Sequence, residues 1–220
     1  MIGQTSQSRR QFILGHTRLL AVPHAPEIFL HVADDSTALW HKTEEELGEM
    51  GLPPPFWAFA WAGGQALARY ILDHPKIVEG KHILDFASGS GLVAIAAARA
   101  GAAKVTASDI DTFSVEAIAI NADANGVTVE TCFADLIGTQ GDWDIVLAGD
   151  ISYEQPLAKS ATNWLARLHN QGTTILIGDP GRTYLARGQL TAIANYKVPV
   201  SRDLEDSEIK DASVWTFSRP

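Results

Sequence analysis

Residues 83–92 place chemically useful groups at short, regular spacing. They read Ile-Leu-Asp-Phe-Ala-Ser-Gly-Ser-Gly-Leu, an apolar run that leads through a glycine-rich turn into an alanine-rich stretch. Glycines such as Gly89 and Gly91 let a backbone approach a ligand closely, and the first N–H groups of a following helix bind an anion. Asp85, at the end of the apolar run, can receive a cationic group. The segment therefore predicts a site for a small ligand that carries both an anionic and a cationic group.

Two more aspartates follow the next strand-like runs. Asp109 comes after the run at 104–107, and Asp135 comes after the run at 127–133. Because ligands bind at the carboxyl ends of the strands in open α/β sheets, we expect these carboxylates to face one ligand. Asp109 can accept hydrogen bonds from both hydroxyls of a ribose, and Ile110 can pack on an adenine. These positions together predict a nucleoside-binding edge.

The glycine-rich turn fits two known motifs. Its Gly-Ser-Gly-Leu-Val-Ala sequence matches the dinucleotide fingerprint, and Asp109 lies where that fingerprint expects an acid, about 20 residues further on. It also resembles motif I of the class I methyltransferases, Asp-x-Gly-x-Gly-x-Gly, with Asp85 at its start and Ala87 in place of the first glycine. Asp85 lies where the methyltransferase motif has a carboxylate, and Asp135 lies where these enzymes hydrogen-bond the adenine amino group. The resemblance therefore implies S-adenosylmethionine as cofactor. An NAD-linked oxidoreductase stays as the more distant alternative.

Strand-like and helix-like runs alternate from residue 62 onward, which predicts a mostly parallel sheet with helices on both faces. The predicted strands are 82–86, 104–107, 127–133, 143–148, 173–177, 196–200 and 213–217. The predicted helices are 64–72, 92–100, 112–124, 156–169 and 184–194. A polar, acidic segment too short for a crossover helix separates the last two strands, so they should form an antiparallel hairpin. The expected fold class is α/β, a Rossmann-like seven-stranded methyltransferase sheet.

The first sixty residues depart from this alternation. Residues 11–40 predict short irregular strands, residues 41–50 a polar helical piece, and the prolines at 53–55 an extended chain. A chain of 220 residues with 46% hydrophobic content predicts one domain. Within this single domain, 1–220, we expect residues 1–60 to form an N-terminal extension that contributes to the substrate side. Residues 61–220 should form the Rossmann-like core.

A second group of candidate residues follows the fourth predicted strand, in the segment Leu-Ala-Gly-Asp-Ile-Ser-Tyr-Glu at 147–154. This place lies beside the switch in strand order, so Asp150 and Tyr153 are expected to face the reacting group. Methylases of nucleobase amino groups usually carry prolines here, and this segment has none. The Asp-x-x-Tyr spacing instead resembles the Asp/Glu-x-x-Tyr/Phe motif of a family of protein lysine methyltransferases.

The resemblance extends to two further segments. Residues 57–64, Trp-Ala-Phe-Ala-Trp-Ala-Gly-Gly, are similar to a Trp-x-x-x-Trp-Pro/Ala-Gly/Ser-Gly pattern, and residues 177–182, Ile-Gly-Asp-Pro-Gly-Arg, also fit. Together these segments resemble the electron transfer flavoprotein β-subunit lysine methyltransferases, including their bacterial members. The resemblance implies an S-adenosylmethionine-dependent protein lysine N-methyltransferase. Its implied target is that β-subunit and, for bacterial members, a ribosomal stalk protein as well.

The motifs assign a role to each candidate. Asp150 and Tyr153 are the expected catalytic residues, and the expected cofactor contacts are Trp61, Asp85, Ala87, Gly89, Gly91, Asp109, Ile110, Asp135 and Ala148. Lysine has a pKa near 10.4, so about one amine in 10³ is neutral at pH 7, and only the neutral amine has a lone pair to attack a methyl group. We expect Asp150 to aim this amine. Tyr153, with Trp57 and Trp61, is expected to wall an apolar channel around it.

Other functions fit the same residues. A small-molecule amine methyltransferase would be favoured by a lid over the site, which the first fifty residues could supply. A non-catalytic scaffold would keep the fold without turnover, but the acids at 85, 109 and 150 argue against it. For Arg182 we expect one of two roles: it either contacts a loop of the target or is an ordinary surface cation.

The charge and composition of the chain indicate which classes of binding partner to expect. A net charge of −9 repels phosphate, so nucleic acid is not expected, whereas a lysine-bearing target suits an acidic surface. The histidines and the single cysteine show no metal-ligand spacing, so no metal is expected. No apolar run approaches the ~18 residues of a membrane span, and the opening residues are polar, unlike a secretory signal. We therefore expect no membrane contact and a cytoplasmic location.

Overall fold

The computed structural model describes residues 5–34, 39, 48, 54–201 and 207–218. The polar helix predicted at 41–50 lies outside these residues, apart from Gly48. Most of the acidic segment before the last strand also lies outside them.

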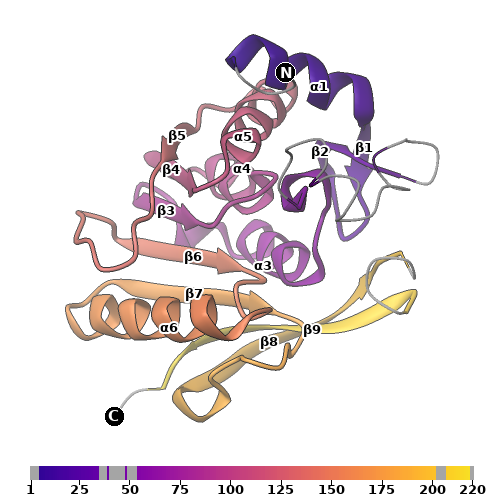
Figure 1. Cartoon of the computed structure of the whole chain (residues 1–220). Helices are drawn as coiled ribbons and strands as arrows, with labels where there is room; N and C mark the ends of the chain where they lie inside the picture. Colours follow the sequence, from indigo (N-terminus) through magenta and orange to yellow (C-terminus); the bar gives the residue numbers. More distant parts are fainter. Residues whose placement is uncertain (1–4, 35–38, 40–47, 49–53, 202–206, 219–220) are drawn as a thin grey trace.

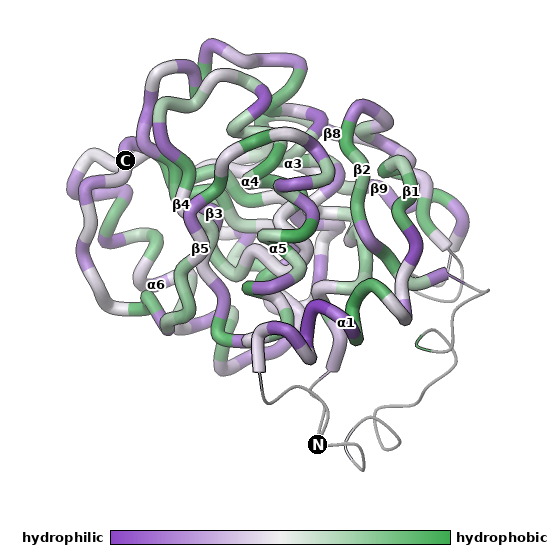
Figure 2. Tube along the Cα trace, turned by 90° about the horizontal axis from the view of Figure 1, so that it is seen from above, coloured by the Kyte–Doolittle hydropathy of each residue, from purple (hydrophilic) through white to green (hydrophobic). Residues whose placement is uncertain are grey.

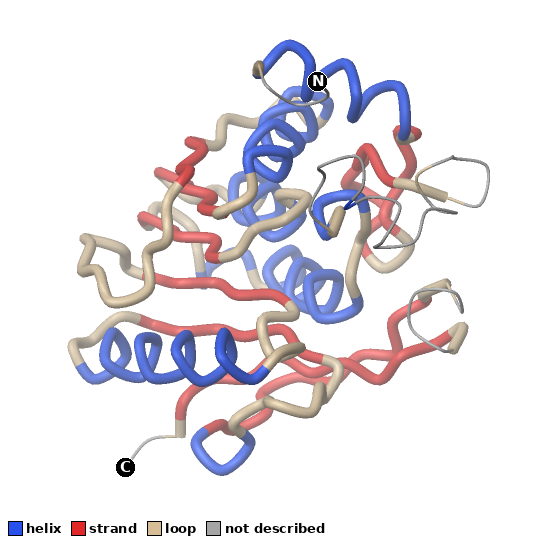
Figure 3. The backbone as a smooth tube through the Cα atoms, in the orientation of Figure 1, coloured by secondary structure: helices blue, strands red, loops and turns tan. Residues whose placement is uncertain are grey.

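A seven-stranded sheet runs through the centre of the molecule (Figures 1 and 3). Its strands, in spatial order, are β5 (Glu130–Phe133), β4 (Lys104–Asp109), β3 (His82–Phe86), β6 (Ile145–Gly149), β7 (Thr174–Asp179), β9 (Ile209–Phe217) and β8 (Leu190–Pro199). The first five pair in parallel, and β9 pairs antiparallel with both β7 and β8. This arrangement confirms the predicted fold class, including the C-terminal antiparallel hairpin.

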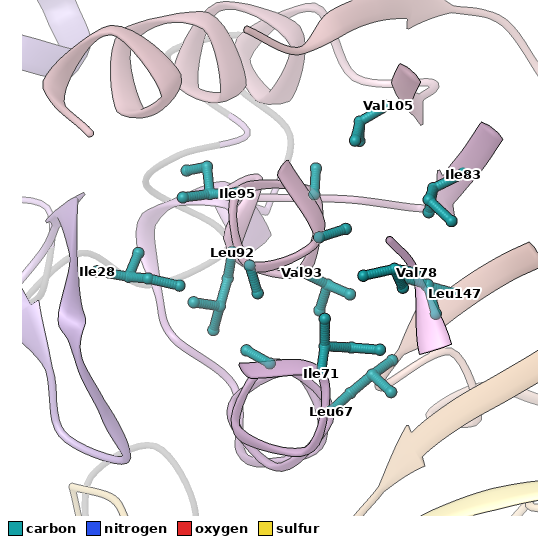
Figure 4. Packing of buried hydrophobic residues seen from close by; sticks show 14 of the residues in the cluster. Ile28, Leu67, Ile71, Val78, Ile83, Leu92, Val93, Ile95, Val105 and Leu147 are labelled. Atoms are coloured by element: carbon teal, nitrogen blue, oxygen red, sulfur yellow. The ribbon is translucent and has the colours of Figure 1, made fainter. Parts of the chain in front are cut away.

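Helices cover both faces of the sheet. The helices are α3 (Ala62–Asp73), α4 (Leu92–Arg99), α5 (Thr112–Ala124) and α6 (Gln155–Asn170). Successive side chains of a strand face opposite sides, so Ile83 joins the cluster of α3 and α4 while Leu84 joins that of α6. Figure 4 shows side chains of α3, α4 and the central strands meeting in the first cluster, and Figure 2 shows the hydrophobic residues gathered along α4 and these strands. The central strands β3, β6 and β7 are buried on both faces, which keeps their ends in place around a site.

The helix predicted at 184–194 is wrong. The chain forms a short 3-10 helix, η3 (Arg187–Gln189), and then enters β8 at Leu190. β8 pairs with β9 along its length, from Leu190 opposite Phe217 to Pro199 opposite Ile209. The local sequence tolerates a helix, but this long-range pairing outweighs local propensity.

The N-terminal part also differs from the prediction, because it begins with a helix. Helix α1 (Ser6–His16) starts at Thr5, whose hydroxyl accepts the Ser8 N–H at 3.1 Å, and the predicted strands follow as β1 (Arg18–Val22) and β2 (Ala25–Val32). Ile28 and Leu30 of β2 are fully buried in the same cluster as α3 and α4. The hairpin is thus packed on the core of the sheet domain.

Candidate active site

A cavity of about 670 Å³ opens at the carboxyl ends of β3, β4 and β6. Nine of the predicted site residues line it, namely Trp61, Asp85, Ala87, Gly89, Asp109, Ile110, Asp135, Asp150 and Tyr153. Two do not. Gly91 starts α4 and contacts Ile118 of α5, where an added Cβ would lie 3.2 Å from the Ile118 Cα. Ala148 is fully buried within the sheet between its neighbours Phe86 and Ile177. Both residues therefore shape the cavity wall from behind.

The glycine-rich turn is built from left-handed backbone. Ala87, Gly89 and Gly91 have φ values of 52°, 55° and 83°. A residue with a Cβ pays about 1–2 kcal/mol to adopt this conformation, which explains why the motif prefers glycine at the position of Ala87. The N-cap residue of α4, Gly91, has no side chain to cap the helix, and Leu92 and Val93 of the first turn line the cavity. The N–H groups of these two residues are therefore available to an anionic group, whereas the Ala94 N–H is bonded to Asp85.

Asp85 lies at the floor of the cavity and is only 1% exposed. Its Oδ2 accepts the Ser88 hydroxyl at 2.5 Å and the Ala94 N–H at 3.0 Å. Burial raises the pKa of Asp85 to about 7, although both hydrogen bonds act in the opposite direction. A cationic group bound beside it would favour the ionised form, so this carboxyl suits an ammonium partner.

Asp109 and Asp111 are two residues apart and make different hydrogen bonds. Asp109 accepts the Gly89 and Asp111 N–H groups, each at 2.9 Å, which ties the glycine-rich turn to the end of β4, and burial raises its pKa. Asp111 accepts the Phe113 N–H at 2.9 Å and caps helix α5. Asp109 is therefore the one that can present a carboxylate to a ribose.

The far end of the cavity is more open. Ile110 is 70% exposed and offers an apolar surface, and Asp135 accepts the Ile137 N–H at 2.9 Å in an exposed turn after β5. Ser88 and Phe113 also line the cavity, and sequence reasoning missed both. Together with the turn, this edge offers partners for a carboxylate, an ammonium, a ribose and a flat base. S-adenosylmethionine carries these four groups, so the residues present fit it.

Asp150 occupies the other end of the cavity, where it is buried and held from two sides. Its Oδ2 accepts the Gly64 N–H at 2.8 Å, and its Oδ1 accepts Arg182 Nη2 at 2.7 Å and Nε at 3.0 Å. Burial raises the pKa of Asp150 to about 6, and the Arg182 guanidinium opposes this rise. Arg182 is thus an ion-pair partner inside the site, so the alternative that it is an ordinary surface cation is wrong. Its contact to a target loop stays a prediction.

Glycines allow the start of α3 to press against the strand ends. A Cβ on Gly63 would lie 2.3 Å from the Gly178 carbonyl oxygen, and a Cβ on Gly149 would lie 3.0 Å from the Gly64 Cα. This close contact brings the Gly64 N–H, in the positive end of the helix dipole, onto the Asp150 carboxylate. The Gly-Gly pair that ends the tryptophan-rich segment was the sequence signal for this approach.

Aromatic rings stand beside Asp150 at the mouth of the cavity. The Phe56 ring lies 5.2 Å from that of Tyr153 and 6.2 Å from that of Trp61, and the Trp61 Nε1–H donates to the Phe56 carbonyl at 2.9 Å. Burial and the neighbouring carboxylate of Glu154 raise the pKa of Tyr153, so its phenol stays neutral. Sequence reasoning missed Phe56, which has no motif of its own.

Trp57 does not belong to this wall, and the expectation that it would is wrong. It is 2% exposed, and its ring stacks on Phe113 at 6.0 Å within a cluster that includes Phe12 and Ile13 of α1. The short 3-10 helix η1 (Phe56–Ala58) turns its side chain inward, away from neighbouring Phe56. Trp57 is a core residue that supports the cavity from behind.

In the part of the chain that the structure describes, no group of three or more His, Cys, Asp or Glu side chains could hold a metal ion. Among the same residues, no helix has the length and apolar character needed to cross a membrane.

The chain is similar in sequence to known methyltransferases. Residues 65–178 match the sequence model of the family described as ribosomal protein L11 methyltransferase (PrmA). The electron transfer flavoprotein beta subunit lysine methyltransferases of Xenopus laevis and Danio rerio are 38% and 35% identical to the chain; the alignments cover 94% and 95% of this chain and 86% and 83% of those proteins.

A solved structure shares the fold. Magnesium protoporphyrin IX methyltransferase from Synechocystis PCC 6803, with bound SAM, superposes with a TM-score of 0.51 at 19% identity, over 71% of this chain and 80% of that one. S-adenosylmethionine is thus the cofactor of this chain, as its sequence predicts. The chain belongs to the family of electron transfer flavoprotein beta subunit lysine methyltransferases.

Proposed function

We propose that this protein transfers methyl groups from S-adenosylmethionine to lysine side chains of the β-subunit of electron transfer flavoprotein. One observation carries the proposal. A buried, doubly held carboxylate, Asp150, lies beside aromatic rings at the opposite end of the cavity from the nucleoside-binding edge. The names of the relatives support the choice of this target.

We call the end of the cavity lined by Asp85, Asp109 and Asp135 the donor end, because it would hold the methyl donor, and the end lined by Asp150 the acceptor end. Bound S-adenosylmethionine supplies a methyl group activated by a positive sulfur. We assign the ammonium of its methionine part to Asp85 and the carboxylate to the first turn of α4. Asp109 would receive the ribose hydroxyls, while Ile110 and Asp135 would contact the adenine. Together these residues would hold and orient the cofactor.

The residues of the acceptor end prepare the nucleophile. Asp150 accepts an N–H of the lysine amine and sets its direction of approach, and Tyr153, Phe56 and Trp61 exclude water around it. Aromatic faces also tolerate the positive charge of a methylated product. Positioning the amine in line with the methyl group is most of the catalysis, because no covalent enzyme intermediate is needed.

The shape of the cavity mouth supports a macromolecular acceptor over a free small amine. Phe56 and Tyr153 are 42% and 43% exposed, so in the described part of the chain the acceptor end faces solvent. A protruding lysine can enter such a mouth while the rest of its protein stays outside. A lysine of a ribosomal stalk protein would meet the same geometry, and this second target remains a prediction.

The test supplies the enzyme with a labelled methyl donor and three acceptors in parallel. These are the purified β-subunit, a ribosomal preparation and a mixture of small amines, each also run with Asp150→Asn enzyme. We expect label on lysines of the β-subunit, located by peptide mass spectrometry, and a large loss with the variant. Labelling confined to the small amines, or to the ribosomal protein, would replace the proposed target.

A further inference from the structure

Arg182 is held against Asp150 inside the acceptor end. Two of its nitrogens, Nη2 and Nε, donate to the same carboxylate oxygen, Oδ1, at 2.7 and 3.0 Å. Its guanidinium carbon lies 5.7 Å from the centre of the Trp61 ring. Arg182 and Asp150 both line the cavity. The guanidinium is therefore part of the surface that an incoming amine meets.

The backbone that carries Arg182 is tied down. Asp179, fully buried at the end of β7, accepts the N–H groups of Gly181 and Arg182 at 2.6 and 2.7 Å. The Asp150 N–H donates to the Gly178 carbonyl at 2.9 Å, which joins the two loops. A side chain that leaves so constrained a turn has a defined direction, so the ion pair is part of the built site.

The pair leaves room for one more donor. A carboxylate has about four lone-pair sites. Arg182 uses two of them on Oδ1, and the Gly64 N–H uses one on Oδ2. An amine that approaches along the cavity can donate to the remaining site on Oδ2 without displacing Arg182.

Charges of both signs surround the place where the amine would bind to Asp150. Asp150 directly follows β6, and Asp179 ends β7. Tyr153 and Glu154 lie on the loop after β6, and Arg182 faces the carboxylates of Asp150 and Asp179. Carboxylates alone would stabilise a lysine ammonium, which is the unreactive form. A guanidinium stays charged at any working pH, and a neighbouring like charge disfavours protonation of an amine.

Building on the proposed function, we propose that Arg182 is a positioning residue that keeps Asp150 aimed and ionised for a lysine N–H and disfavours the protonated amine. The amine must lose a proton to solvent before it attacks. Its lone pair then forms the new N–C bond while the C–S bond breaks, and the electron pair of that bond stays on sulfur. The product amine releases a second proton if it leaves as the neutral form.

The first test compares Arg182→Met and Arg182→Lys with the wild-type enzyme on the purified β-subunit, at saturating methyl donor and across pH 6.5–10. Met keeps the bulk and loses the charge; Lys keeps the charge and loses the two-nitrogen contact. We expect the rise of kcat with pH to shift about one pH unit upward in Arg182→Met, so kcat near pH 7.5 falls ~10-fold. Arg182→Lys should keep the wild-type pH profile at a lower plateau.

Arg167→Met is the matched control, because Arg167 is exposed near the far end of α6 and its loss makes the same change in net charge. It should leave the profile unchanged. An unshifted profile in Arg182→Met together with a lower KM for the β-subunit would overturn the proposal, since Arg182 would then be a competitor that lysine displaces. A wild-type enzyme that labels no β-subunit would instead refute the proposed function.

The second readout needs no turnover. When the pKa of a carboxyl is higher in the folded than in the unfolded state, the free energy of unfolding of the protein falls as the pH rises. This fall ends once the pH has passed the folded-state pKa. Asp150 completes this loss near pH 6 in the wild-type protein, and without Arg182 the loss continues to higher pH. The Tm deficit of Arg182→Met should therefore be larger at pH 8 than at pH 5. A deficit that is equal at both values would mean that Arg182 only packs.

Discussion

The two ends of the cavity are assembled in different ways. At the donor end, Asp85 is bonded to groups 3 and 9 residues away, and Asp109 to groups 2 and 20 residues away. At the acceptor end, Asp150 is bonded to Gly64 and Arg182, which are 86 and 32 residues away. The donor end is thus a local structure of two adjacent strand–turn–helix units. The acceptor end exists only when three distant segments have come together.

This difference predicts a difference in sensitivity. Changes at the donor end should alter cofactor affinity while the acceptor end stays intact. Changes at the acceptor end should leave the cofactor bound and remove methyl transfer.

Asp150→Asn should give the largest loss. The amide keeps the size of the side chain but cannot offer a charged acceptor to the amine, and it loses the ion pair with Arg182. We expect methyl transfer to fall ~10²–10³-fold, the scale seen when a positioned polar group is lost. Calorimetry should show S-adenosylhomocysteine affinity within a few-fold of wild type. A comparable loss of that affinity would mean that the two ends are coupled.

Asp109→Ala should produce the opposite pattern. Loss of its hydrogen bonds to the ribose should weaken S-adenosylhomocysteine binding by about 2–4 kcal/mol, and it also releases the Gly89 N–H. Asp111→Ala is the control two residues away. It removes the cap of α5, so it should lower the free energy of unfolding by about 1 kcal/mol and barely change affinity. Equal affinities for the two variants would exclude Asp109 from the ribose site.

Gly63→Ala should damage the acceptor end through the backbone. The added Cβ would lie 2.3 Å from the Gly178 carbonyl oxygen and 2.6 Å from Asp150 Oδ2, so α3 must move away from the strand ends. We expect a loss of about 1–3 kcal/mol in urea unfolding and reduced methyl transfer. Gly15→Ala, in α1 with no described atom within 4 Å of its Cβ, should be neutral or slightly stabilising. Wild-type stability in Gly63→Ala would show that the contact is looser than described.

The donor end should respond to pH through Asp85. Its folded-state pKa of about 7 is raised by burial, so the carboxyl is largely protonated at pH 6 and must ionise to receive an ammonium. We expect S-adenosylhomocysteine affinity to fall ~10-fold between pH 8 and pH 6. In Asp85→Asn, affinity at pH 8 should be low and this dependence should disappear. A dependence retained in that variant would have to come from another group.

Ala87→Gly should have the smallest effect. Ala87 has φ of 52°, which costs about 1–2 kcal/mol for a residue with a Cβ, whereas glycine adopts it freely. The greater freedom of glycine in the unfolded chain offsets part of this gain, by about 0.4–1 kcal/mol. We expect a slightly higher urea midpoint and unchanged affinity. A clear loss of stability would show that the Ala87 methyl makes a contact worth more than the strain.

Some expectations stay predictions. The roles of the individual site residues, the single domain 1–220 with its extension at 1–60, and the cytoplasmic location rest on sequence reasoning. The same holds for the absence of nucleic acid, membrane and metal partners.

Local sequence was enough to predict the donor end and most of the sheet. Strand, turn and helix follow one another within a few residues there. The places of the glycines and aspartates around 85–91 and 109 can therefore be predicted from the neighbouring sequence alone. Only the tertiary structure decided the rest. Helix α3 had to meet β6 and β7 before Asp150 could pair with Arg182, and η1 had to turn Trp57 into the core while Trp61 stayed in the cavity. Likewise, residues 190–194 became a strand because β9 offered backbone partners that no local pattern reveals.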